Sequence, residues 1–313
     1  MKFRQLGKSG LKVSLLGLGC NNFGGRADLE TTRKLIHRAM DLGISFFDTA
    51  DVYSNGASEE YMGRVLGERR KDVVLATKFG ATMGGPPETP AGASRRYVMS
   101  AVEASLRRLQ TDWIDLYQLH WPDPATPIEE TLRTLDDLVR QGKVRYIGCT
   151  NLAAWQTVEA QWTSRHLGLH CFVSCQNEYN LLNRSVEREI LPAAQAHGLG
   201  FLPYFPLASG LLTGKYRRNA PMPEGARLTY VQVLANRFLT EANWSKAEEL
   251  AGFAQARSHS PVELAIAWLA AQPAVSSVIA GATRPEQLEA NVRALEWSLS
   301  AEELADIDRL TRH

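Results

Sequence analysis

Short hydrophobic runs of strand length recur along the chain, and most are followed by a segment with helical periodicity. Several runs start about thirty residues apart, roughly the length of one strand–helix unit. Most are apolar at successive positions, as expected for parallel strands that helices cover. The eight runs are residues 13–19, 44–50, 72–79, 114–120, 143–151, 171–178, 198–205 and 276–281.

Start and stop signals flank several of the predicted helices. Residues 126–129, 260–263 and 300–303 each place Ser or Thr three positions before Glu, which predicts a capping box. Ser94 precedes a segment whose apolar residues fall on one helical face. Gly142 predicts the end of the helix that starts near residue 126.

Eight strands with intervening helices predict a closed (β/α)8 TIM barrel more than an open sheet. The first residues predict a β-hairpin that turns across Gly7–Gly10 and caps the bottom of the barrel. Two connections are long, residues 80–92 and 206–240, and long loops in compact domains are often functional. With no linker between halves, residues 1–313 are expected to form a single barrel domain.

Composition and charge narrow the possible partners. Hydrophobic residues make up 44% of the chain, charged residues 22%, and the net charge is +1, all typical of a globular protein in water. No basic stripe indicates nucleic acid. No apolar stretch approaches the ~18 residues of a membrane span, and the N-terminus lacks the apolar run of a signal peptide. We therefore expect no membrane association and a cytoplasmic location.

The four cysteines do not predict a metal site. Cys171 and Cys175 lie in one predicted strand. Four residues along a strand span about 13 Å, which is too far for both thiolates to bind one tetrahedral ion. Packed thiols are the simpler interpretation.

Polar residues stand at the C-terminal tips of nearly all the predicted strands. The tip is where active sites form in (β/α)8 barrels. A ring of polar tips is hard to explain by packing alone. The residues are Asp48, Lys78, His120, Thr150, Asn151, Gln176 and Tyr204.

Four residues at or after these tips suit proton transfer to a carbonyl oxygen. Lys78 should be buried and paired with Asp48, and its charge should lower the pKa of Tyr53. Tyr53 could then exchange a proton, and His120 could donate a hydrogen bond to the substrate oxygen. Taken one at a time, each residue has a simpler explanation. Tyr53 could be exposed in a surface loop, and Asp48 could start a turn or cap a helix. Lys78 could extend to solvent, and His120 could bond backbone groups. Their joint placement favours a site.

Segments in a fixed order resemble the aldo-keto reductase family over nearly the whole chain. The motif style is similar to bacterial members related to the β-subunits of voltage-gated potassium channels. The resemblance implies a barrel reductase with a nicotinamide cofactor and no metal, whose catalytic tetrad is Asp48, Tyr53, Lys78 and His120. The matching segments are GLG at 17–19, FGG at 23–25, FFDTADVY at 46–53, ATK at 76–78, DLYQLHWPD at 115–123, IGCTN at 147–151, QNEYN at 176–180, PLASGLLTGKY at 206–216 and IAGATRPEQLEAN at 279–291.

The resemblance also implies where cofactor and substrate bind. The nicotinamide ring is expected flat against Tyr204. Trp121, with Tyr53 and His120, is expected to contact the substrate, and Phe23 and Tyr230 to line the mouth. The other expected cofactor residues are Asn21, Asp48, Thr150, Asn151, Gln176, Pro206, Leu207, Gly210, Lys215, Arg227, Gly281, Thr283, Arg284, Gln287 and Asn291.

Cations near the expected adenosine end favour NADPH over NADH, although NAD remains possible. Arg284 lies at the start of a predicted helix, where phosphates bind, and Arg227 resembles another family contact. Thr283 and Glu286 could instead form a capping box. Two departures from the family weaken the preference: Ala290 stands where Glu is usual, and Ala280 where Pro is common.

Other nucleotide sites fit less well. The spacing of Gly210 and Gly214, with Tyr216 in place of Ser or Thr, is not that of a P-loop. No G-x-G-x-x-G motif follows a strand with an acidic residue behind it, so a Rossmann site is not expected.

The leading hypothesis is an NADPH-dependent reductase of aldehydes or ketones that acts on a small-molecule carbonyl. The alternative is a cofactor-sensing regulatory subunit like the channel β-subunits, which carry Asn where this chain has His120. A third reading is a lyase or aldolase that forms a Schiff base through Lys78. No oligomeric state is predicted.

Overall fold

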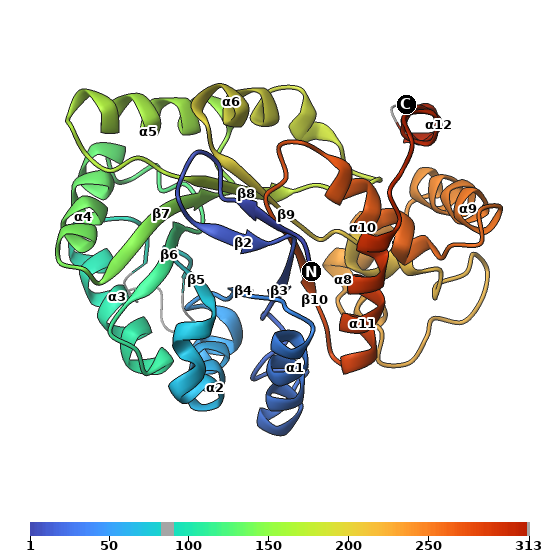
Figure 1. Ribbon diagram of the computed structural model, residues 1–313, viewed down its shortest axis with the longest axis horizontal. Coiled ribbons are helices and arrows are strands. Elements are labelled where there is room, and N and C mark those ends of the chain that lie inside the picture. The colour runs from blue at the N-terminus through green and yellow to red at the C-terminus, as the bar shows by residue number, and fades with distance from the viewer. Residues whose placement is uncertain (83–90, 312–313) are drawn as a thin grey trace.

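The computed structural model describes residues 1–82 and 91–311 and contains an eight-stranded parallel sheet (Figure 1). Its strand order is β10-β3-β4-β5-β6-β7-β8-β9, so that neighbours along the chain are neighbours in the sheet. The strands are β3 (Leu16–Gly19), β4 (Phe46–Asp48), β5 (Val74–Phe79), β6 (Ile114–Leu119), β7 (Val144–Thr150), β8 (Ser174–Glu178), β9 (Gly200–Tyr204) and β10 (Val278–Gly281).

The sheet closes on itself between β9 and the segment that leads into β10. Phe201 N donates to Ala274 O at 3.0 Å, and Ser276 N donates to Phe201 O at 2.9 Å. Closure leaves neither β9 nor β10 as a free edge. The predicted (β/α)8 barrel is confirmed.

Helices surround the barrel on its outside, as Figure 1 shows. The capping boxes predicted at Ser260 and Ser300 are present, with Ser260 N donating to Glu263 and Ser300 N to Glu303. The helices are α1 (Leu29–Asp41), α2 (Ala57–Leu66), α3 (Arg95–Leu109), α4 (Ile128–Arg140), α5 (Ala154–His166), α6 (Ile190–His197), α7 (Arg227–Tyr230), α8 (Gln232–Phe238), α9 (Glu241–Gln255), α10 (Pro261–Ala271), α11 (Pro285–Arg293) and α12 (Ala301–Thr311).

The N-terminal hairpin of β1 (Phe3–Gln5) and β2 (Lys12–Ser14) is antiparallel and lies across the barrel, as predicted (Figure 1). Its Leu6 and Val13 are fully buried. They pack with inward-facing barrel residues, among them Phe46 and Leu116. The hairpin therefore fills the barrel end opposite the strand tips, and this leaves the tip end for a cavity.

Three local predictions differ from the structure. The apolar run 13–19 is split, because its first residues belong to β2 and only Leu16–Gly19 enters the barrel. The capping box at residues 126–129 is wrong: Pro127 precedes α4, and the Thr126 hydroxyl bonds Asp123 instead. The connection 206–240 is not irregular throughout, since it contains α7 and α8.

Most of the other long connection, residues 80–92, lies outside the described residues. Within the part of the chain that the structure describes, no helix is both long and apolar enough to cross a membrane.

Candidate active site

Alternation along the strands directs the polar tip residues into the barrel. On β5, Ala76 belongs to the inner core and Lys78 follows it by two, so Lys78 also points inward. Thr77, between them, points outward, where it donates to Glu59 of α2. On β4, Asp48 follows inward-facing Phe46 in the same way. Strand parity thus brings Asp48 and Lys78 together from neighbouring strands.

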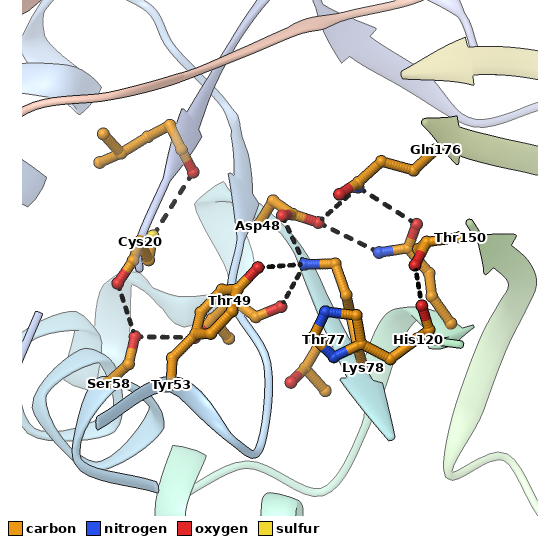
Figure 2. A network of polar contacts seen from close by, with 12 residues as sticks. Cys20, Asp48, Thr49, Tyr53, Ser58, Thr77, Lys78, His120, Thr150 and Gln176 are labelled. Atoms are coloured by element: carbon orange, nitrogen blue, oxygen red, sulfur yellow. Dashed lines mark hydrogen bonds and ion pairs between the residues drawn. The ribbon is translucent and has the colours of Figure 1, made fainter. Parts of the chain in front are cut away.

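The Lys78 ammonium lies at the centre of the site (Figure 2). The residue is 1% exposed. Its Nζ donates to Asp48 Oδ2 at 2.6 Å, to the Thr49 carbonyl at 2.8 Å and to the Tyr53 hydroxyl at 3.3 Å. An ammonium has three N–H bonds, so all three are used. Burial acts to lower the pKa of Lys78, but the charge of Asp48 and the hydrogen bonds outweigh it, and the pKa is raised. Lys78 is therefore a fixed cation.

Asp48 is held by two amides as well as by Lys78. Its Oδ1 accepts from Gln118 Nε2 at 3.1 Å and from Gln176 Nε2 at 3.0 Å. Sequence reasoning missed Gln118, although a signal existed: it precedes His120 by two on β6, and it pairs with Lys78 in register. Three donors thus hold the Asp48 carboxylate, which is 2% exposed, in one orientation.

Tyr53 reaches Lys78 from a short turn after β4. The 3-10 turn Tyr53–Gly56 contains Ser54 and Asn55 in the left-handed region, at φ 49° and 53°. Burial raises the pKa of the Tyr53 phenol, and the nearby Lys78 charge only partly offsets this. The prediction that Lys78 lowers this pKa overall is wrong for the protein by itself, because burial penalises the phenolate more than one cation favours it. The Tyr53 phenol is therefore neutral near pH 7.

His120 faces the Tyr53 ring at 5.9 Å between ring centroids. Burial and the Lys78 charge lower the pKa of His120 to about 3, so the imidazole is neutral near pH 7. Its backbone carbonyl accepts from the Thr150 hydroxyl and from Asn151 Nδ2. The His120 backbone is thus fixed from β7, and the neutral ring has one N–H to donate.

A cavity of about 620 Å³ opens over these groups. Of the predicted catalytic and cofactor residues, Lys78 alone does not line it, and its Nζ lies 5.0 Å from the Tyr53 ring centroid. The predicted residues that do line it are Asn21, Asp48, Tyr53, His120, Trp121, Thr150, Asn151, Gln176, Tyr204, Pro206, Leu207, Gly210, Lys215, Arg227, Gly281, Thr283, Arg284, Gln287 and Asn291.

Comparison with known proteins agrees with this geometry. The model of the aldo/keto reductase family matches residues 15–312. The chain belongs to the aldo-keto reductase family. This family consists of oxidoreductases that generally use NAD(P)H. The chain is therefore an oxidoreductase by family.

Two kinds of relative stand out. A probable voltage-gated potassium channel subunit beta of Arabidopsis thaliana is 41% identical over 303 residues, covering 95% of this chain and 92% of that protein. The L-glyceraldehyde 3-phosphate reductase of Escherichia coli (strain K12) is 37% identical over 322 residues, covering 99% of this chain and 92% of that protein. The chain is thus similar both to a probable channel subunit and to a reductase of L-glyceraldehyde 3-phosphate.

Four cations gather at one end of the aldo-keto reductase cavity: Arg26, Lys215, Arg227 and Arg284. Within residues 1–82 and 91–311, none of them is ion-paired with a carboxylate. Burial and the charges of the three arginines lower the pKa of Lys215, which means that the cations repel one another. Such a cluster is expected where an anionic ligand binds.

Sequence reasoning missed Arg26, which follows β3. Its Nη2 donates to the Gly225 carbonyl at 2.7 Å. From the other side, Arg227 Nη2 donates to Asn22 Oδ1 at 2.8 Å. The two reciprocal bonds join the loop after β3 to the residues around the start of α7. The only sequence signal was a lone Arg after the FGG motif.

Three expectations about the rim differ from the structure. Phe23 is fully buried and does not line the mouth. Tyr230 is not among the residues that line the cavity. It is 53% exposed, and the Arg26 guanidinium lies 5.4 Å from its ring centroid. The possible capping box of Thr283 and Glu286 does not form, because Thr283 N donates to Gln287 Oε1 instead.

Two further buried carboxyl groups, those of Asp51 and Glu59, lie near the Tyr53 turn. Asp51 is 2% exposed, and its Oδ1 has no hydrogen-bond partner within the described residues. Its Oδ2 accepts from the Tyr97 hydroxyl at 3.4 Å. Burial, together with the nearby Glu59 charge, raises the pKa of Asp51 to about 7, while Glu59 is paired with Arg108. Asp51 is therefore a carboxyl group that folding keeps protonated in mild acid.

Asp51→Asn is expected to stabilise the protein at alkaline pH. The folded pKa near 7 lies above the ordinary 3.8. Ionisation of Asp51 therefore costs stability progressively between about pH 4 and pH 7, and the full cost persists above pH 7. The cost is at most about 4 kcal/mol. Thermal unfolding should show Asp51→Asn gaining more over wild type at pH 8 than at pH 5. Equal gains in stability at both pH values would contradict the raised pKa of Asp51. Asp112→Asn, at an exposed carboxylate, is the control and should show no such difference between the two pH values.

Proposed function

We propose that this protein is an NADPH-dependent reductase of aldehydes or ketones, in which Tyr53 protonates the carbonyl oxygen. The observation that carries the proposal is the buried chain of contacts from Asp48 through Lys78 to the Tyr53 hydroxyl, at the floor of the cavity. A bound nicotinamide cofactor would supply hydride to the carbonyl carbon. The residues of the chain would then hold the oxygen, deliver the proton and bind the cofactor.

Proton delivery follows from the charges around Tyr53. As negative charge develops on the substrate oxygen, the Tyr53 proton moves toward it. The phenolate that remains is stabilised by Lys78 Nζ at 3.3 Å. Asp48 keeps Lys78 charged, and the amides of Gln118 and Gln176 hold Asp48 in place. Because these groups are already oriented, little reorganisation opposes the transfer.

The neutral His120 ring suits an oxygen-binding role better than a proton-donating one. With a pKa near 3, it carries no charge at working pH. Its single N–H can donate to the carbonyl oxygen and stabilise the charge that develops there. Trp121, which is 50% exposed and stacks on His120 with ring centroids 6.1 Å apart, would then border the substrate.

The cavity suits a dinucleotide with phosphate groups at one end and an amide-bearing ring at the other. Arg26, Lys215, Arg227 and Arg284 offer uncompensated positive charge for phosphates. Tyr204, held by a 2.8 Å bond from its hydroxyl to Asn151 Oδ1, offers a flat ring face near the tetrad. The residue types and their charges therefore fit NADPH.

Arg284→Gln is expected to weaken NADPH binding by about tenfold, the effect of losing one charge-assisted hydrogen bond. NADH, which lacks the 2′-phosphate, should lose less than about threefold by the same reasoning. Fluorescence titration of both cofactors measures the two effects. Arg293→Gln, at the exposed far end of the same helix, is the control. An equal loss for both cofactors would contradict NADPH selection by Arg284.

Consumption of NADPH with a panel of aldehydes and ketones tests the proposed function. The panel should include L-glyceraldehyde 3-phosphate, because a relative is a reductase of that compound. The proposal expects a carbonyl-dependent fall in NADPH absorbance with formation of the alcohol. Tight NADPH binding with no turnover on any carbonyl would contradict it.

A second candidate is a cofactor-sensing regulatory subunit. The 41% identity to a probable potassium channel subunit beta favours it. His120, which faces Tyr53 in the cavity, favours the reductase instead. Retention of a potassium-channel domain by the immobilised protein, together with absence of carbonyl turnover, would reverse this order.

A further inference from the structure

We propose that Gln118 is a positioning residue that couples the Asp48–Lys78–Tyr53 relay to the recognition of the cofactor's carboxamide by Gln176. The inference rests on the proposed function. Gln118 is fully buried within β6 and does not line the cavity, so it acts only through its neighbours.

The charge of Asp48 fixes the orientation of both amides. An ionised carboxylate can only accept hydrogen bonds. Gln118 and Gln176 must each turn their NH2 group toward Asp48 Oδ1, at 3.1 Å and 3.0 Å. Gln176 Nε2 also approaches Gln118 Oε1 at 3.5 Å, which closes a triangle of three side chains.

This orientation determines which atom Gln176 presents to a ligand. Because its NH2 faces Asp48 and Gln118, its Oε1 is left to face the cavity, which Gln176 lines. Within the described part of the chain, Gln176 Oε1 accepts no hydrogen bond. An amide oxygen in this position recognises an N–H donor.

The two neighbouring candidates are already engaged. The Asn151 amide donates to the His120 carbonyl and to Thr150 Oγ1, and its Oδ1 accepts from Tyr204. The Thr150 hydroxyl donates to the same carbonyl. Of these three side chains, Gln176 is therefore the one whose oxygen, Oε1, is free to accept a hydrogen bond from the NH2 of a carboxamide.

Gln118 supplies the second contact that keeps Gln176 from turning. Without it, Gln176 retains only one hydrogen bond to Asp48 and no acceptor on β6. The Gln176 side chain then has more freedom, and its oxygen is no longer presented in one direction. Asp48 also loses one of its three hydrogen-bond donors. That donor lies on β6, directly beside Lys78 in the register of β5 and β6.

Binding of a cofactor analogue tests the inference without any turnover. In 3-acetylpyridine adenine dinucleotide phosphate, a methyl group replaces the carboxamide NH2. Isothermal titration should find that wild type binds NADP+ about tenfold more tightly than the analogue, the effect of one hydrogen bond to a buried acceptor. In Gln118→Met, which keeps the side-chain length, the ratio should fall below about threefold.

Gln161→Met is the matched control, because Gln161 is 1% exposed and its Nε2 bonds the Phe172 carbonyl far from the cavity. It should keep the wild-type ratio. An unchanged ratio in folded Gln118→Met overturns the inference, and so does a wild-type ratio near one. Failure of wild type to bind either compound overturns the proposed function itself.

Gln118→Glu keeps the inference testable if Gln118→Met does not fold. A protonated Glu can donate to Asp48 as the amide does, whereas an ionised Glu would repel it. The NADP+-to-analogue ratio of Gln118→Glu should therefore fall as pH rises, while the wild-type ratio stays constant. A pH-independent ratio equal to that of wild type would overturn the inference.

Discussion

Tyr53→Phe is expected to lower kcat for carbonyl reduction by about 10²–10⁴-fold, the range for loss of a positioned proton donor. The ring that Phe retains keeps its packing against His120, at 5.9 Å between centroids. Only the hydroxyl that accepts from Lys78 Nζ is removed. Steady-state assays give kcat, and fluorescence titration gives the NADPH dissociation constant.

NADPH affinity should change less than about threefold in Tyr53→Phe, well under the ~1.4 kcal/mol that makes a tenfold change. A loss of turnover with unchanged cofactor binding identifies a group used in the chemical step. Tyr61→Phe on α2 is a control that should retain activity. Near-normal turnover in Tyr53→Phe would contradict the assignment of Tyr53 as proton donor.

Lys78→Met is expected to reduce both stability and activity. Met fills much of the same volume but leaves Asp48 buried without its cation. Breaking a buried ion pair from one side costs about 3–5 kcal/mol. Turnover should fall by about 10²-fold or more, because no cation stabilises the Tyr53 phenolate. Urea unfolding and steady-state kinetics measure the two effects.

The double variant Asp48→Asn/Lys78→Met separates these effects. It removes both charges, so it should recover part of the lost stability without recovering activity. A single Lys78→Met variant as stable as wild type would contradict the charged, buried pair seen at 2.6 Å. A double variant with wild-type turnover would contradict the role of Lys78.

Much of the fold follows from the sequence because each barrel strand is an apolar run with a helix after it. The split of residues 13–19 could not be seen, since Val13 and Leu16 are both buried, one in the hairpin and one in the barrel. The short α7 and α8 were missed because their few turns give little periodicity. Thr126 has the spacing from Glu129 that is typical of a helix cap. Its hydroxyl instead donates a hydrogen bond to Asp123 Oδ2.

The tetrad could be placed from sequence because strand tips of a parallel barrel meet at one end. Asp48 and Lys78 are thus neighbours through topology alone. The sign of the Tyr53 pKa shift could not be predicted, since it depends on how deeply the phenol is buried. Arg26 was missed because its cavity contact needs the loop before α7 to fold across from it.

The most direct test of the account is the transfer of label from cofactor to product. The wild-type protein is mixed with a reducible aldehyde and NADPH deuterated at C4 on the transferred face, and the alcohol is analysed by mass spectrometry and NMR. We expect one deuterium at the carbinol carbon for each NADPH oxidised, and none with Tyr53→Phe on the same timescale. Alcohol formed without deuterium, or with wild-type label and rate in Tyr53→Phe, would contradict carbonyl reduction through Tyr53.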